Sequence, residues 1–314
     1  MDFFLQQLIN GLSLGSLYAL IAVGYTVVYG IVQLINFAHG EIFMVGAFGA
    51  LSVWLVLGKP NWDATAALLV LLPLMILGGI LVSVLVALLT ERFAYRPLRN
   101  APRLAPLISA IGVSVFLQEF VRLFYGTIPG FPSAKSAIPF PQIAGISGHV
   151  LQFGGVTIQF SALFTIGALI VCGVFLWFYV NRTKTGRAMV ATSQDPDTAR
   201  LMGINVDKVI MAAFAVGAAL AAIAGVAHGL RYGNIDIRMG FLAGLKAFTA
   251  AVLGGIGNIA GAVVGGIVLG VVEALASTYL GTSAWKDVWA FALLILVLVF
   301  RPQGLLGAKV VDRA

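Results

Sequence analysis

Residue types that commonly do chemistry are sparse in this sequence and lie far apart. The three histidines, His39, His149 and His228, form no His-Glu-x-x-His zinc motif. The Gly-x-Ser-x-Gly spacing occurs at residues 11–15, but there it lies within a long apolar run and not at the strand-to-helix turn that a nucleophilic serine needs. The Gly-x-x-x-x-Gly-Lys-Ser/Thr loop that cradles nucleotide phosphates is also missing from the sequence. We therefore predict that the chain is not an enzyme and binds no metal or cofactor, and that any ATP with its Mg²⁺ is used by partner ATPase subunits.

Four charged residues lie within apolar runs, where a charge at a helix centre costs about 2.5–3.5 kcal/mol on insertion scales unless it finds a partner or water. Glu119 and Arg122 are three residues apart, a spacing that favours a structural pair on one helix face. Lys246 and Glu273 lie on successive apolar runs. They could pair with each other, or each could contact headgroups or other helices independently.

Asn36, His39 and Glu41 cluster between the first two apolar runs. A broken helix at this point could present backbone groups and polar side chains to a translocation path. The alternative is a capped loop at the cytoplasmic end of the helices. Both interpretations remain open from the sequence.

The connection 181–208 contains a short predicted helix. Asp195 can cap its N-terminus, Pro196 suits its first position, and Gly203 can end it. Asp197 would lie near the positive end of the helix. Ala199 and Met202, three residues apart, would form a small apolar ridge for the groove of another protein.

The chain as a whole has the composition of a membrane protein. Of its 314 residues, 60% are hydrophobic and only 10% are charged, whereas soluble domains carry about 25% charged residues. Helix-length apolar runs rather than alternating strands predict an all-α polytopic bundle of about eight or nine membrane segments, folded as one transmembrane domain over residues 1–314. These runs cover residues 11–35, 42–57, 65–90, 104–125, 160–180, 209–230, 241–256, 259–276 and 287–300.

The net charge of +7 orients this bundle. Twelve of the nineteen Lys and Arg residues follow the third, fifth and last runs, and short cytoplasmic loops are enriched in these residues. We expect the N-terminus outside, the C-terminus in the cytoplasm, and the protein in a cytoplasmic membrane. Because the positive-inside distribution explains the net charge, we do not expect the chain to bind nucleic acid.

The region 241–276 is rich in glycine and predicts a tight helical hairpin. Small residues at intervals of four let helix backbones touch, and the central glycines suit a turn. The hairpin could cross the membrane twice or be re-entrant. The glycines expected to pack it are Gly254, Gly255, Gly257, Gly261 and Gly265.

Several motifs resemble those of the branched-chain amino acid ABC transporter permease family, specifically its LivH-type subunit. Residues 15–30 and Ile35-Asn-Phe-Ala-His-Gly-Glu41 are similar to its N-terminal signature, and residues 185–189, 203–206 and 246–258 are also similar. The segment 197–203 resembles a relaxed form of the EAA loop, Glu-Ala-Ala followed after three residues by Gly, with Asp for Glu and Thr for the first Ala.

The resemblance implies an importer with a second homologous permease subunit, two cytoplasmic ABC ATPases that grip residues 181–208, and an external substrate-binding protein. The expected cargo is amino acids, branched-chain ones above all, although the family also suggests urea or amides. An ion-coupled secondary transporter remains an alternative, for which only Glu119 and Glu273 are candidate coupling carboxylates. A membrane scaffold or receptor without transport is the third possibility.

Overall fold

The computed structural model describes residues 2–60, 62–99, 101–102, 104–281 and 283–307. Each predicted apolar run falls on a helix, which confirms the all-helical membrane bundle. The principal helices are α1 (Asp2–Val32), α2 (His39–Val56), α4 (Leu72–Thr90), α5 (Leu104–Phe124), α6 (Phe160–Arg182), α9 (Val206–Tyr232), α10 (Met239–Gly254), α11 (Ile259–Tyr279) and α12 (Lys286–Phe300).

Among the described residues, seven helices are long and apolar enough to cross a membrane. One of them runs continuously over Ala64–Leu98 and has a π-helical turn just before Pro73, which lacks an N–H group for the regular helix ladder. Helices α10 and α12 have 16 and 15 residues, or about 24 and 22 Å at about 1.5 Å per residue, and are shorter than a hydrocarbon core of about 30 Å.

Shorter elements connect and extend these helices. Helix α4 is preceded without a break by α3 (Ala64–Ala66) and the π-helical turn η1 (Ala67–Leu71). It is followed by the π-helical turn η2 (Glu91–Tyr95) and the 3₁₀ turn η3 (Arg96–Leu98). The others are η4 (Tyr125–Thr127), η5 (Ser283–Trp285), α7 (Lys184–Gln194), α8 (Pro196–Leu201), β1 (Ile138–Pro139), β2 (Val150–Phe153), β3 (Val156–Gln159) and β4 (Asn234–Ile235).

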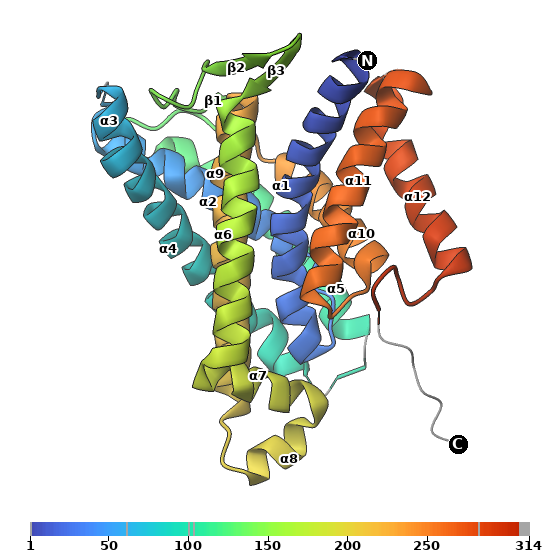
Figure 1. The fold of residues 1–314 in the computed structure, drawn as a ribbon. Helices are drawn as coiled ribbons and strands as arrows, with labels where there is room; N and C mark the ends of the chain where they lie inside the picture. Colours follow the sequence, from blue (N-terminus) through green and yellow to red (C-terminus); the bar gives the residue numbers. More distant parts are fainter. Residues whose placement is uncertain (1, 61, 100, 103, 282, 308–314) are drawn as a thin grey trace.

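The two ends of the bundle carry different elements (Figure 1). The start of α1 and the β2–β3 hairpin lie at one end, and α7 and α8 lie at the other. Strands β2 and β3 pair antiparallel, and the Gln6 side chain of α1 bonds both backbone groups of Thr157 in β3. The two-residue strands β1 and β4 also pair antiparallel. The hairpin is thereby fixed to the first helix.

Helix α1 runs through the middle of the bundle, packed against α6, α9, α10 and α11 (Figure 1). Its contact with α11 depends on glycine, because Gly15 and Gly270 bring the two backbones together. A Cβ atom at Gly15 would lie 2.7 Å from the Cα of Ile267. The Cα of Ile267 belongs to the backbone of α11, so it cannot move aside unless the whole helix shifts.

We expect Gly15→Ala to destabilise the bundle by about 1–3 kcal/mol, the usual cost of overpacking a filled interface. Thermal unfolding of the purified protein in detergent measures the change. Gly173→Ala on α6 is the matched control, because no atom lies within 4 Å of a Cβ at that position. Equal melting temperatures for the two variants would contradict the tight α1–α11 contact.

Helices α10 and α11 pack closely around a short turn. The backbones meet where Gly254 lies on Gly261 and where Gly265 lies on Ala250. Gly255 and Gly257 in the turn have φ angles of +107° and +94°, a region that L side chains rarely adopt. The chain following α12 returns to this turn, where Leu305 and Leu306 donate backbone hydrogen bonds to the last carbonyls of α10 at Leu253 and Gly254.

Candidate functional site

The connector between α1 and α2 folds into the bundle and buries its polar residues. Asn36, His39 and Glu41 are 2%, 1% and 0% exposed. The Asn36 amide oxygen accepts hydrogen bonds from the Tyr95 hydroxyl at 3.0 Å and from the Ala38 backbone at 3.1 Å. This arrangement starts α2 within the protein, deeper than the cytoplasmic loop that the charge distribution predicts for these residues.

The depth of this start can be measured along α1. The His39 imidazole lies directly against Gly24, eight residues before the end of α1 at Val32, or about 12 Å along a helix that rises about 1.5 Å per residue. Its ring also packs on the Tyr25 ring at a centroid distance of 4.6 Å. The backbone of α2 also lies close to that of α10 at this point, because Gly40 packs against Gly240 and Gly244.

Glu41 is the central polar group of the site. Its Oε1 atom accepts hydrogen bonds from Gln118 Nε2 at 2.7 Å and from Ser114 Oγ at 3.0 Å, both on α5. Its Oε2 atom is buried against Gly240 and has no hydrogen-bond partner among the described residues. Gly240 is the second residue of α10, so the positive end of this helix favours the buried carboxylate.

A cavity of about 670 Å³ adjoins this cluster between α5 and α10. Ser114 and Gln118, the two partners of Glu41, line its wall. The full lining is Tyr25, Phe37, Ile111, Ser114, Val115, Gln118, Arg238, Phe241, Leu242 and Leu245. Polar and charged side chains at membrane depth face water or other protein rather than lipid. The polar groups of this cavity come from Tyr25, Ser114, Gln118 and Arg238, and its other six lining residues are apolar.

Lys246 and Glu273 form a buried ion pair that joins α10 to α11. Lys246 Nζ lies 2.7 Å from Glu273 Oε1 and 2.6 Å from Asp287 Oδ1 at the start of α12. The Tyr18 hydroxyl of α1 donates to Glu273 Oε2 at 3.0 Å, and the ammonium lies 5.6 Å from the Tyr18 ring centre. The sequence left open whether Lys246 and Glu273 pair with each other or contact other groups, and in the structure they pair. It also adds Asp287 and Tyr18, so that the cluster connects four helices.

Glu119 and Arg122 pair on the outside of α5. The guanidinium lies 2.5 Å from Glu119 Oε2, and both side chains are well exposed at 39% and 48%. This pair does not line the cavity beside Gln118. Its position fits the structural role predicted from the spacing.

The short helix α8 has the predicted caps. Asp195 Oδ1 accepts from the backbone N–H groups of Asp197 at 3.0 Å and Thr198 at 3.1 Å, Pro196 is the first helical residue, and Gly203 follows with φ +82°. The Thr198 hydroxyl and these amides lower the pKa of the Asp195 carboxyl below its usual value. The ionised carboxylate therefore caps α8 fully when the pH is above the usual pKa of an aspartate. The cap is lost only when the pH falls through the lowered pKa of Asp195.

The exposed apolar surface of α8 differs from the predicted ridge. Ala199 is 4% exposed, whereas Leu201 and Met202 are 88% and 78% exposed. The pairing of Ala199 with Met202 as an outward ridge is therefore wrong, because Ala199 faces its own chain. The exposed apolar surface consists instead of Met202 and Leu201, a residue that the three-residue spacing did not identify.

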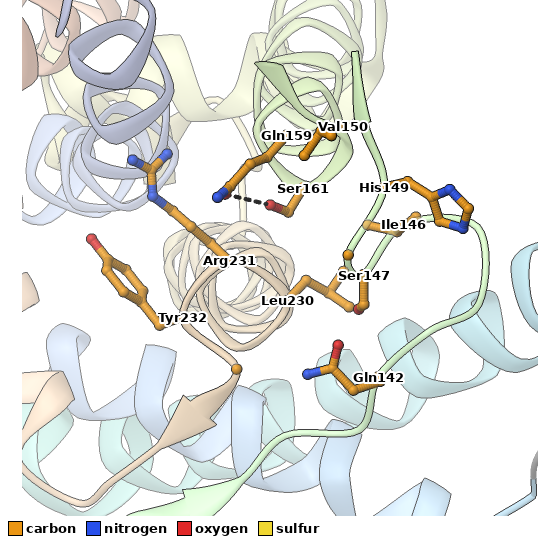
Figure 2. Close-up of a pocket in the computed structure, with 12 residues that line it drawn as sticks. Gln142, Ile146, Ser147, His149, Val150, Gln159, Ser161, Leu230, Arg231 and Tyr232 are labelled. Carbon is orange, nitrogen blue, oxygen red and sulfur yellow. Dashed lines mark hydrogen bonds between the residues drawn. The ribbon is translucent and has the colours of Figure 1, made fainter. Parts of the chain in front are cut away.

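A second, smaller pocket of about 240 Å³ lies at the hairpin end of the bundle. Figure 2 shows it between the loop that carries Gln142 and His149, the start of α6, and the end of α9. Ser161 Oγ donates to Gln159 Oε1 at 3.4 Å on one wall. Arg231 points toward α1, where it bonds Ser13. This pocket and the Glu41 cluster lie on different parts of the fold.

Three signals in the sequence could have identified more of the site. Gln118 and Ser114 are polar residues within the apolar run 104–125, and Arg238 closely precedes the run 241–256. An amide or an arginine at such places marks a candidate path residue. Lone polar residues carry no spacing pattern, which is why motif analysis missed them.

Comparisons of the sequence with known proteins identify a single family. Residues 7–298 match the family model described as branched-chain amino acid transport system / permease component. The chain is 45% identical, over 99% of its length and 98% of the relative, to the high-affinity branched-chain amino acid transport system permease protein BraD of Pseudomonas aeruginosa. It is equally similar, with the same coverage, to the permease protein LivH of that system in Escherichia coli K12.

Among solved structures, a chain of PsaBC from Streptococcus pneumoniae in complex with Fab superposes with a TM-score of 0.49 at 11% identity, covering 96% of this chain and 92% of that chain. The family model covers most of the chain, and the two permeases match it from end to end. The chain is therefore a transport permease rather than an enzyme, and it belongs to the branched-chain amino acid transport system permease family.

Proposed function

We propose that this chain forms half of the translocation path of an ABC importer that carries branched-chain amino acids into the cell. The observation that carries the proposal is the cavity of about 670 Å³ beside Glu41, into which Ser114, Gln118 and Arg238 bring polar groups between apolar walls. The names of the BraD and LivH relatives support branched-chain amino acids over urea or amides as the cargo.

The orientation belongs to this proposal. With the N-terminus outside the inner membrane and the C-terminus in the cytoplasm, α8 would extend toward the cytoplasmic ATPases. The connection 181–208 would then act as the coupling loop, with Leu201 and Met202 entering a groove of the ATPase. The fixed caps of α8 would transmit the movement of the ATPases to α7 and α9.

The remaining partners would occupy the other surfaces. A second, homologous permease would cover the cavity between α5 and α10, because Gln118 and Arg238 in its lining are unsuited to lipid. The external binding protein would dock on the hairpin end, where the 240 Å³ pocket lies. The compact α10–α11 pair, whether it spans fully or re-enters, would form the rigid side of the path.

Uptake measurements test this function. A cell that lacks this chain should lose most ATP-dependent uptake of radiolabelled leucine, isoleucine and valine, and the restored chain should recover it. Liposomes that contain the chain alone should show no uptake under an ion gradient. Gradient-driven uptake by the isolated chain would favour the secondary transporter instead, and unchanged uptake in the deleted cell would exclude the proposed cargo.

A further inference from the structure

We propose that the cavity between α5 and α10 contains a weak binding site for a zwitterionic aliphatic amino acid. Arg238 would bind its carboxylate, and Gln118, backed by Glu41, would bind its ammonium group. The inference rests on the proposed function and deepens it. It assigns part of the selectivity to the permease itself.

The negative side of the site is built from two layers. Gln118 lines the cavity, and its Nε2 atom donates to Glu41 behind it at 2.7 Å. The amide oxygen of Gln118 is therefore directed elsewhere and is free to accept from an ammonium group. Glu41 is fully buried behind Gln118 and does not line the cavity, so it acts on the solute through the Gln118 amide that it orients.

The positive side is Arg238, which immediately precedes α10 and lines the same cavity. Its backbone is held by Asp236, whose Oδ1 atom accepts from the Arg238 N–H at 2.6 Å. In the part of the chain that the structure describes, the Arg238 guanidinium has no hydrogen bond or ion pair with another side chain. Arginine stays charged and binds carboxylates through two parallel hydrogen bonds, so an incoming carboxylate suits it.

The two sides of the site meet near the start of α10. Glu41 contacts Gly240, only two residues beyond Arg238, and its partner Gln118 lines the same cavity as Arg238. The cavity thus offers a cation and a hydrogen-bond acceptor to a single small solute. An amide would lack the carboxylate that pairs with Arg238.

The rest of the wall selects the side chain of the solute. It consists of aliphatic and aromatic residues, namely Phe37, Ile111, Val115, Phe241, Leu242 and Leu245. A charged side chain would lose its hydration there without a partner. A volume of about 670 Å³ is within the usual range for small-molecule sites and leaves room for water around one amino acid. Such loose contact suits a site that must also release its solute.

The test uses the complete importer in liposomes, with leucine-loaded binding protein outside and ATP inside. We expect Arg238→Gln to reduce leucine uptake by about tenfold, the loss of one charge-assisted contact, while ATP hydrolysis stays stimulated. The number of leucines per ATP should fall accordingly. Arg238→Lys, which keeps the charge but not the paired geometry, should recover uptake to within about threefold.

Arg122→Gln is the matched control, since this arginine lies on the outer face of α5 and should leave leucine per ATP unchanged. If Arg238→Gln impairs assembly, Gln118→Leu tests the opposite side of the site, and the number of leucines transported per ATP is again the quantity measured. Equal leucine per ATP in Arg238→Gln and Arg122→Gln would overturn the site while leaving the proposed function intact. Failure of the wild-type complex to import leucine would instead count against the proposed function.

Discussion

Leu201→Ser combined with Met202→Ser should uncouple the permease from its ATPases and reduce leucine uptake by about tenfold or more. The two side chains are 88% and 78% exposed at the end of α8, an unfavourable arrangement for large apolar groups unless a partner covers them. Truncating a buried apolar anchor at an interface costs on the order of 2 kcal/mol, which exceeds a tenfold loss of affinity. The N-cap side chain of Asp195 and the positive φ of Gly203 are untouched, so α8 itself should remain folded.

Co-purification of the ATPase subunits with the tagged permease measures this loss directly, alongside uptake. The matched control is Val150→Ser with Leu151→Ser, two exposed apolar residues on β2 at the opposite end of the bundle. If the control loses ATPase binding equally, the effect is a general loss of stability. If the α8 variant keeps its ATPases and its uptake, the coupling role of residues 181–208 is wrong.

Lys246→Met should be the most destabilising single change in the membrane interior. It leaves Glu273, 4% exposed, without its cation and removes the link to Asp287. Breaking a buried ion pair by removing one partner costs about 3–5 kcal/mol. The double variant Lys246→Met with Glu273→Gln should recover much of this loss, because no charge is then buried alone and Gln can still bond Tyr18.

Thermal unfolding in detergent compares these variants with Arg122→Met, which breaks the exposed pair with Glu119 and should cost less than about 1 kcal/mol. A Lys246→Met variant as stable as Arg122→Met would show that the buried cluster contributes nothing. Exchanging the charges of Lys246 and Glu273 would be a poor test of the pair, because the new glutamate would face Asp287.

Much of the bundle could be predicted because membrane helices are specified locally. Twenty or so apolar residues in a row leave a helix as the way to satisfy the backbone in lipid. The caps of α8 were equally accessible, since Asp195, Pro196 and Gly203 act on their own neighbours in the chain. Both successes depend on short-range chemistry.

The candidate site was harder because it depends on long-range contacts. The charge distribution treats every connection as a loop at the membrane surface, whereas residues 33–38 fold inward and carry Glu41 to Ser114 and Gln118 of α5. Asp287 was missed as a partner of Lys246 for a related reason. It stands at the beginning of an apolar run, and its depth depends on how far η5 lets α12 return into the bundle.

The backbone contact between the end of the chain and the α10–α11 turn implies an order of events during biosynthesis. The last carbonyls of α10, at Leu253 and Gly254, receive their hydrogen bonds from Leu305 and Leu306, near the end of the described chain. A nascent chain therefore leaves this turn incomplete until residues 305 and 306, which follow α12, have been synthesised. Premature termination after α12 would expose the unpaired carbonyls, a local defect by which quality-control proteases could distinguish unfinished copies from complete ones.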